Sequence, residues 1–321
     1  MKKMLPFLIA CMCLTACNDS HANSLEEPVT YTSDTTNMVY LTYSGTSVSA
    51  IVCENIKNYV TIASTGAHVR VVQSTNVGVS TGEITYELTG TSSDGSFYME
   101  GAYKSTVSLR ALTLTNPNGP AIDIQNGKRV EISIKRDTEN TLTDGTSTAA
   151  DAWKGCLQCK GHVEFKGYGT LNVYGNYANA IWSKEYMTVR NCTINVLKAV
   201  KDGINCNQYF AMESGVVNIS GQGDDGISVG LKNNDTSAEN TGSFTMTGGT
   251  ININPSGAEG TAVNAAGKQS VAATATLNTS WTQGVSHVSD GVKSVKVLRN
   301  GQVLIIRNGR TYTPNGNLIN N

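Results

Sequence analysis

Hydrophobic and polar residues alternate in short segments along most of the chain, and in its second half these segments recur at a fixed step. One phrase consists of an apolar residue, an Asn and a second apolar residue. Its first apolar positions are Leu171, Ile194, Val217 and Ile251. The first two steps are 23 residues each, and the third is 34, which is 23 plus an insertion of 11. A repeat of this length indicates a solenoid in which each repeat forms one coil.

Two further phrases keep nearly the same step. Alternation with period two is typical of half-buried strands, and helical spacing is not sustained in this region. Three strands per coil, stacked at the ~4.8 Å strand spacing, would place equivalent side chains above one another. We therefore predict an all-β fold, a right-handed parallel β-helix with three sheets and coils of about 23 residues. The hand is expected from the crossover rule and from the family resemblance described below. The second column would contain Ile181, Ile204, Ile227 and Val263, and the third Val163, Met187, Phe210 and Phe244.

The weaker upstream pattern places the start of the β-helix near Met38, and its last clear phrase places the end near Ala266. Insertions are expected at 144–153 and 230–241, on a face that can shape a binding surface. Residues 267–292, rich in Ala, Thr and Ser, are predicted to be a linker. Residues 295–312 contain two Asn-Gly pairs between β-rich runs, so residues 293–321 are predicted to form a small β-hairpin tail.

The N-terminus has the features of an export signal. Lys2 and Lys3 precede an apolar run from Met4 to Leu14, which is too short to span a membrane stably. The tetrad that ends at Cys17, Leu-Thr-Ala-Cys, is similar to a bacterial lipobox. We predict a signal peptide at 1–16, lipidation of Cys17 and a polar tether at 17–37. The expected location is the cell envelope, as an outer-membrane lipoprotein with cell-surface exposure left open, held to the membrane by its lipid alone.

Composition adds two limits. Charged residues make up 15% of the chain and the formal net charge is −1, with no stripe of Lys and Arg, so nucleic-acid binding has no support. Five cysteines follow Cys17, and an odd number argues against a complete disulfide framework. Cys156 and Cys159 have the spacing of half a zinc site, but the repeat register places Cys159 in an inward column. Buried thiols are the preferred interpretation.

An aromatic row is the first candidate for binding chemistry. His162, Tyr186 and Tyr209 each precede an inward residue of the third column, so alternation places them outside on three successive coils. Trp182 lies on the neighbouring strand. Exposed aromatic faces can stack on sugar rings, which predicts a carbohydrate-binding surface at these four residues. An aromatic ladder that only stabilises the sheet is an equally good interpretation.

An acidic column is the second candidate. Asp202 and Asp225 occupy equivalent positions on successive coils, and Asp224 is adjacent. Stacked carboxylates repel unless a cation lies between them, and calcium accepts six to eight oxygen ligands in flexible geometry. We predict a calcium site at these three residues; the alternative is a solvated Asp-Gly turn. Asn179 and Thr261 replace Asp on the flanking coils, which limits the column to few ions.

Two other features bear on function. Asn172, Asn195, Asn218 and Asn252 form an outward column that stacked amides can stabilise by hydrogen bonds. A pectate-lyase-type elimination would need calcium and a nearby base. Lys184 and Lys201 are the cations close to the acidic column, and no convincing active site is predicted.

Residues from about Met38 to Ala266 resemble a family of bacterial β-helix carbohydrate-binding domains, first recognised in a cellulolytic clostridium and related in shape to pectate lyases. The matching segments are 139–145, 167–177, and the Asp-Gly-Ile phrases at 202–204 and 225–227. The resemblance implies binding of cellulose-like glucans or acidic polysaccharides, with calcium at the coil ends. The expected function is that of a surface-anchored, non-catalytic lipoprotein that binds polysaccharide with the assistance of calcium. The alternatives are a calcium-dependent polysaccharide lyase and a structural or adhesive surface protein.

Overall fold

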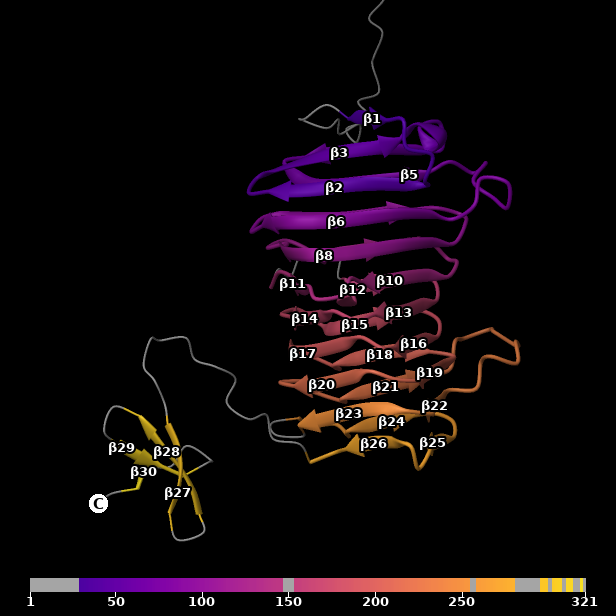
Figure 1. Cartoon of the computed structure of the whole chain (residues 1–321). Coiled ribbons are helices and arrows are strands. Elements are labelled where there is room, and N and C mark those ends of the chain that lie inside the picture. The colour runs from indigo at the N-terminus through magenta and orange to yellow at the C-terminus, as the bar shows by residue number, and fades with distance from the viewer. Residues whose placement is uncertain are drawn as a thin grey trace, which may run out of the picture. The chain divides into compact units, whose positions relative to one another are not determined.

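The computed structural model describes residues 29–146, 153–254 and 258–280, together with 295–299, 302–307, 310–313 and 318–319. The predicted signal peptide at 1–16 and the lipidation site Cys17 lie outside these residues. The chain divides into two compact units, residues 1–281 and 282–321, which are considered separately. The first unit is a stack of mostly parallel strands, which Figure 1 shows as successive layers from indigo to orange.

One wall of the stack is a nine-stranded sheet. Its neighbouring strands are parallel, except that the first two strands are antiparallel to each other. Each strand contributes one layer, and alternate side chains point inward. Its strands are β4 (Val60–Thr65), β5 (Ala67–Gln73), β7 (Gly95–Glu100), β9 (Ile122–Ile124), β12 (Gly155–Cys159), β15 (Asn179–Ser183), β18 (Ile204–Asn207), β21 (Ile227–Gly230) and β24 (Val263–Ala265).

The other two walls belong to a single 17-stranded sheet. One file of strands carries the Asn-containing phrase: β11 (Glu139–Thr143), β14 (Thr170–Gly175), β17 (Thr193–Ala199), β20 (Val216–Ser220), β23 (Gly249–Asn254) and β26 (Ala275–Asn278). The other file is β10 (Val130–Ile134), β13 (Val163–Gly167), β16 (Met187–Arg190), β19 (Tyr209–Met212), β22 (Ser243–Met246) and β25 (Gln269–Val271).

The two files join into one sheet because the strands that precede them in the stack are long. β6 (Ile84–Ser92) and β8 (Ser105–Thr115) each cross both walls, and β8 pairs with β10 through its first half and with β11 through its second. Between these halves Ala111 has a φ of 50°, the left-handed conformation, which bends the strand at the corner. In the next coil Asp137, with a φ of 58°, occupies the turn that separates β10 from β11.

The predicted columns are confirmed by the strand register. Ile181 pairs with Ile204, Ile204 with Ile227, and Ile227 with Val263. Leu171, Ile194, Val217 and Ile251 pair in the same order, as do Val163, Met187, Phe210 and Phe244. Each Ile-to-Ile step is one coil. The repeat in the sequence therefore produces columns of similar side chains along the stack.

The N-terminal end differs from a simple parallel coil. β2 (Met38–Ser44) and β3 (Ser47–Cys53) form an antiparallel hairpin, as do β4 and β5, and the single turn of 3-10 helix η1 (Glu54–Ile56) follows β3. β1 (Thr30–Thr32) pairs with β3, so ordered structure begins before Met38, inside the predicted tether. Within the described residues no coil precedes this end, and the antiparallel hairpins supply backbone partners that a preceding coil would otherwise provide.

At the other end the stack continues beyond Ala266. β25 pairs with β22 and β26 pairs with β23, so the first part of the predicted linker 267–292 forms one more coil. The expected boundary was wrong because this coil has few apolar residues. All three residues of β25 are exposed, since no further coil among the described residues covers them.

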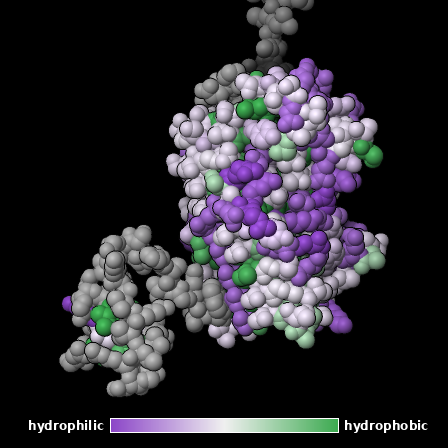
Figure 2. All heavy atoms as spheres, in the orientation of Figure 1, coloured by the Kyte–Doolittle hydropathy of each residue, from purple (hydrophilic) through white to green (hydrophobic). Residues whose placement is uncertain are grey.

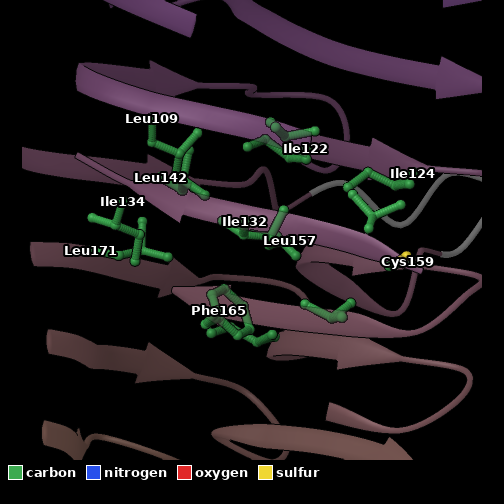
Figure 3. Packing of buried hydrophobic residues seen from close by; sticks show 14 of the residues in the cluster. Leu109, Ile122, Ile124, Ile132, Ile134, Leu142, Leu157, Cys159, Phe165 and Leu171 are labelled. Atoms are coloured by element: carbon green, nitrogen blue, oxygen red, sulfur yellow. The ribbon is translucent and has the colours of Figure 1, made fainter. Parts of the chain in front are cut away.

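The core runs along the axis of the stack. Figure 3 shows side chains from all three walls meeting between the ribbons, among them Leu142, Leu157 and Phe165. The five described cysteines are free and buried, as predicted, and Cys159 lies in the inward column beside Ser183. The outer surface seen in Figure 2 is mainly hydrophilic or neutral, with apolar residues scattered singly.

Glycines fit the corners for two different reasons. Gly215 and Gly249 have φ values of 94° and 79°, which side-chain-bearing residues rarely adopt. Gly203 and Gly226 do not need this freedom. A Cβ on Gly226 would lie 2.5 Å from the carbonyl oxygen of Ala262 in the next coil, so close approach of the coils excludes any side chain there.

The second unit is a four-stranded antiparallel sheet. Its strands are β27 (Val295–Arg299), β28 (Gln302–Arg307), β29 (Arg310–Tyr312) and β30 (Leu318–Ile319). The pairing of β27 with β28 spans Asn300-Gly301, one of the two predicted hairpin turns.

Candidate functional site

The three aspartates of the acidic column come together as predicted. Asp202, Asp224 and Asp225 can each direct one carboxylate oxygen to a common point, with these oxygens within 4.8 Å of one another. Asp202 lies in the turn before β18, and the other two lie in the turn before β21. Asp202 and Asp225 are buried while Asp224 is exposed. The cluster therefore opens to solvent on one side.

Hydrogen bonds connect this column from coil to coil. Oδ1 of Asn179 accepts the backbone N–H of Asp202 at 3.1 Å, and Oδ1 of Asp202 accepts that of Asp225 at 3.2 Å. Oδ1 of Asp225 then accepts the N–H of Thr261 at 2.7 Å. An Asn or Asp side chain at this position thus caps the next coil, which explains why both residue types can occupy the column.

The second carboxylate oxygens are also engaged. Asn205 Nδ2 donates to Asp202 Oδ2, and Asn264 Nδ2 donates to Asp225 Oδ2, both at 2.7 Å. Burial raises the pKa of Asp202, Asn205 opposes that rise, and the charges of Asp225 and Asp224 add to it. A carboxylate oxygen has two lone pairs, so an oxygen that accepts only one hydrogen bond can still bind a cation. The donor set fits a hard divalent ion such as calcium.

The predicted aromatic row forms, but its rings face one another. The ring centroids of His162 and Tyr186 are 4.1 Å apart, and those of Tyr186 and Tyr209 are 4.6 Å apart with planes inclined by 13°. Rings stacked in this way use their faces for mutual contact and present edges to solvent. His162 also contacts the Glu185 carboxylate, which binds Lys232 Nζ at 2.5 Å. This geometry favours the stabilising ladder over the sugar platform; sugar binding by these three residues stays a prediction.

Trp182 lies apart from this row, on β15 in the nine-stranded sheet, where it borders a pocket of about 180 Å³. The outward residues of the three strands β9, β12 and β15 that form the floor are in register: Asp123 pairs with Gln158, and Gln158 with Trp182. Trp153, the last residue of the insertion predicted at 144–153, and the next residue, Lys154, contribute a wall. Gln125 and Lys160 also line the pocket, as do Ile124 and Cys159.

The pocket combines two aromatic residues with polar groups and two exposed lysines. Lys154 Nζ lies 5.3 Å from the ring centroid of Trp182. Gln158 Oε1 accepts the backbone N–H of Lys154 at 2.8 Å, and Gln125 Nε2 donates to Asp123 Oδ1 at 2.5 Å. Burial raises the pKa of Asp123, and the hydrogen bonds from Gln125 and Gln158 oppose that rise. Aromatic surface with a few fixed polar groups is the composition of small-ligand sites.

Most of these pocket residues were not predicted. Asp123 and Gln158 could have been found, because they occupy the same phrase position as Trp182, directly after Ile122 and Leu157. Trp153 and Lys154 lie at the end of the insertion, where no periodicity applies. They lie near Trp182 because the chain returns to the nine-stranded sheet at β12.

The Asn column is a continuous ladder, as predicted. Asn195 donates to Asn172 at 2.8 Å, Asn218 to Asn195 at 2.9 Å, and Asn252 to Asn218 at 2.8 Å. The ladder is longer than expected, because Asn278 extends it at one end and Glu139 accepts from Asn172 at the other. Each amide in its interior is both donor and acceptor, which supports a structural role.

Comparisons with known proteins agree with this architecture. A family model described as carbohydrate-binding domain-containing protein matches residues 71–314. The chain therefore belongs to this carbohydrate-binding domain family. A solved structure titled polysaccharide lyase-like protein from C. thermocellum, gadolinium derivative, has the same fold, with a TM-score of 0.58 and 20% identity. The match covers 75% of this chain and 99% of that one. No curated protein matches the chain.

The described residues contain no helix with the length and apolar character needed to cross a bilayer.

Proposed function

We propose that the protein binds polysaccharide without cleaving it, and that the pocket bordered by Trp182 is the binding site. The observation that carries the proposal is the convergence of Trp182, Trp153 and two exposed lysines on one cavity, in a chain of the carbohydrate-binding domain family. An indole presents a flat apolar face to the C–H groups of a sugar ring. The amides of Gln125 and Gln158 lie beside it, where they can bind sugar hydroxyls.

Charge selects among polysaccharides. Lys154 and Lys160 line the pocket and are exposed to solvent. Two ammonium groups beside an aromatic face complement a sugar that carries a carboxylate, such as a uronic acid. We therefore expect acidic polysaccharides to bind more tightly than neutral glucans, with an affinity that decreases as salt is added.

The test is affinity electrophoresis and calorimetry with polygalacturonate and with a soluble β-glucan. Trp182→Ala should weaken binding at least tenfold, or about 1.4 kcal/mol. Replacement of both Lys154 and Lys160 by Gln should weaken only the acidic ligand. Tyr168→Ala, which removes a solvent-exposed aromatic outside the pocket, is the matched control. Retention of neither polysaccharide by the unchanged protein would contradict the proposal.

Calcium is the second element of the proposal. The oxygens of Asp202, Asp224 and Asp225 support it, because three carboxylates so close together gain stability from a divalent ion. Added calcium should raise the melting temperature, and a chelator should reverse the rise. Asp224→Asn leaves the coil-to-coil hydrogen bonds of Asp202 and Asp225 in place, so it should remove the calcium response alone. Magnesium, which demands stricter geometry, is the matched ion control.

Anchoring through Cys17 completes the proposal for location. The tetrad that ends at Cys17 supports it. Metabolic labelling with a fatty-acid analogue should mark the protein and should fail for Cys17→Ser. Protease accessibility on intact cells would then distinguish surface exposure from a position facing the periplasm.

A calcium-dependent lyase is the second candidate, because Lys201 directly precedes Asp202 and could supply a base next to bound calcium. Elimination creates a carbon–carbon double bond that absorbs ultraviolet light. A rise in absorbance with polygalacturonate that is lost in Lys201→Ala would establish this function instead. Burial raises the pKa values of Tyr186 and Tyr209, so neither phenol is poised as the base at neutral pH.

A further inference from the structure

Asp144 and Trp153 are joined across the base of the insertion. Asp144 follows β11 and is 2% exposed, and Trp153 precedes β12 and is 7% exposed. The indole Nε1–H of Trp153 donates to Oδ2 of Asp144 at 2.7 Å. The two residues are nine positions apart in the sequence. The carboxylate therefore closes the loop and fixes the orientation of an indole that lines the pocket.

The other oxygen of the same carboxylate faces a second donor. Oδ1 of Asp144 accepts the backbone N–H of Asn176, and the Asn176 side chain donates back to the Asp144 carbonyl at 2.8 Å. Tyr177, the next residue, packs against Trp153 with ring centroids 4.3 Å apart. One buried carboxylate thus binds the indole of Trp153 and the backbone N–H next to the tyrosine whose ring packs on that indole.

Lys154 transmits this arrangement to the rest of the pocket. Its backbone N–H is bound by Gln158, and its carbonyl accepts from Asn179 Nδ2 at 2.7 Å. The Lys154 ammonium lies over the Trp182 ring. A change at Trp153 therefore acts directly on the neighbour that contacts the other indole.

We propose that Asp144 is a positioning residue for the pocket: its carboxylate seats Trp153 in the wall, and proton uptake by that carboxylate loosens the wall and weakens polysaccharide binding. This inference rests on the proposed function of the pocket. Asp144 does not line the cavity itself, so its effect on binding passes through Trp153. It would make the protein release its ligand on mild acidification.

The chemistry of the carboxyl group explains the direction. Both oxygens face N–H donors, so a proton on either one meets a donor instead of an acceptor and disrupts one of the two hydrogen bonds. Burial raises the pKa of Asp144 to about 6, although the bonds from Trp153 and Asn176 oppose the rise. Of the charged and titratable groups around it, Lys198 of β17 favours the anion, and the Cys156 thiol of β12 faces it from the core.

The first measurement follows Trp153 without any sugar. In ¹H–¹⁵N spectra of the full chain, the indole N–H signal that disappears in Trp153→Phe should shift with a midpoint near pH 6. The shift reports loss of the bond to a charged acceptor. In Asp144→Asn the same signal should stay constant, because the amide cannot titrate and presents one donor where the carboxylate has two acceptors.

The second measurement is affinity for polygalacturonate from pH 5 to pH 7.5. The unchanged protein should bind at least fivefold more tightly at pH 7.5 than at pH 5. Asp144→Asn should show the weaker affinity at every pH. Asp123→Asn, which removes the carboxylate that lines the pocket, is the control and should keep the pH dependence.

The outcomes separate the two proposals. If the indole signal titrates but no polysaccharide binds at any pH, the proposed function is contradicted. The hydrogen bond between Asp144 and Trp153 would then be a structural feature without a role in binding, which also overturns the positioning role. Binding with an equal pH profile in Asp144→Asn and the unchanged protein would overturn the positioning role and retain the proposed function. An indole signal that stays constant from pH 5 to pH 7.5 would show that no proton taken up by Asp144 disturbs Trp153, which overturns the proposal.

Discussion

Oδ1 of Asp202 accepts the backbone N–H of Asp225, the residue one coil further along the stack, at 3.2 Å. Asp225 in turn accepts the N–H of Thr261. The same side chains that cap successive coils are therefore the ones that could bind calcium. Structural capping and ion binding can be separated by mutation, because Asp224 takes part in the cluster while the coil-to-coil bonds belong to its two neighbours.

Asp225→Ala should lower the free energy of unfolding by about 1–3 kcal/mol, because it leaves the Thr261 N–H and the Asn264 amide without their acceptor. Asp224→Ala, at the exposed member of the cluster, should change it by about 0.5 kcal/mol or less without calcium. Urea unfolding in the presence of chelator measures both. Equal effects of the two substitutions would contradict the capping role.

The Asn ladder predicts a dependence on position. Asn218→Ala removes two ladder hydrogen bonds and should cost about 1–2 kcal/mol, whereas Asn278→Ala at the exposed end removes one and should cost about 0.5 kcal/mol. The double substitution of Asn195 and Asn218 should be less than additive, since the two share a bond. Additive costs would show that the stacked amides act independently.

Tyr186→Leu distinguishes the two interpretations of the aromatic row. The substitution removes stacking on both His162 and Tyr209 and should lower the free energy of unfolding by about 1–2 kcal/mol. Retention on polysaccharide should stay unchanged, because the ring faces already contact one another. Loss of retention at full stability would instead support the sugar platform at these three residues.

Protonation of Asp144 should stabilise the folded protein although it weakens polysaccharide binding. Its folded pKa of about 6 lies above the ordinary value of 3.8, so the folded state binds the proton more tightly. The stability that this contributes is present below pH 3.8 and is lost as pH rises through 6. Between pH 7 and pH 4.5 the difference amounts to about 2 kcal/mol. Thermal unfolding of Asp144→Asn across this range should lack that contribution.

The buried thiols should be inert. Burial raises the pKa values of Cys159 and Cys192 to about 12, so almost no thiolate forms at pH 8. Alkylation mapped by mass spectrometry should leave these two cysteines, together with Cys53, Cys156 and Cys206, unmodified in the folded protein and modified in denaturant. Rapid labelling of Cys156 or Cys159 in the folded protein would reopen the zinc interpretation.

The repeat in the sequence was enough to predict the columns of the core. A parallel stack places residues of equal phase above one another, so Ile181, Ile204 and Ile227 had to pair once the three phrases were aligned. The acidic column and the Asn ladder followed from the same register. The repeat did not predict the two ends, because the hairpin of β2 and β3 and the polar last coil depart from it.

The pocket shows where this reasoning ends. Periodicity fixes which side chains share a wall, and it could have placed Asp123 and Gln158 beside Trp182. It does not say how rings orient within a row, and the stacking of Tyr186 on Tyr209 was decided by packing. Nor does it place residues of an insertion. Trp153 reaches the pocket because a buried carboxylate, Asp144, binds its indole from the far side of the loop. The sequence by itself determined the coil and its columns, since regular backbone pairing repeats whatever the chain repeats. The tertiary structure alone decided the site, since contacts between irregular segments depend on burial and hydrogen bonding that no periodic pattern records.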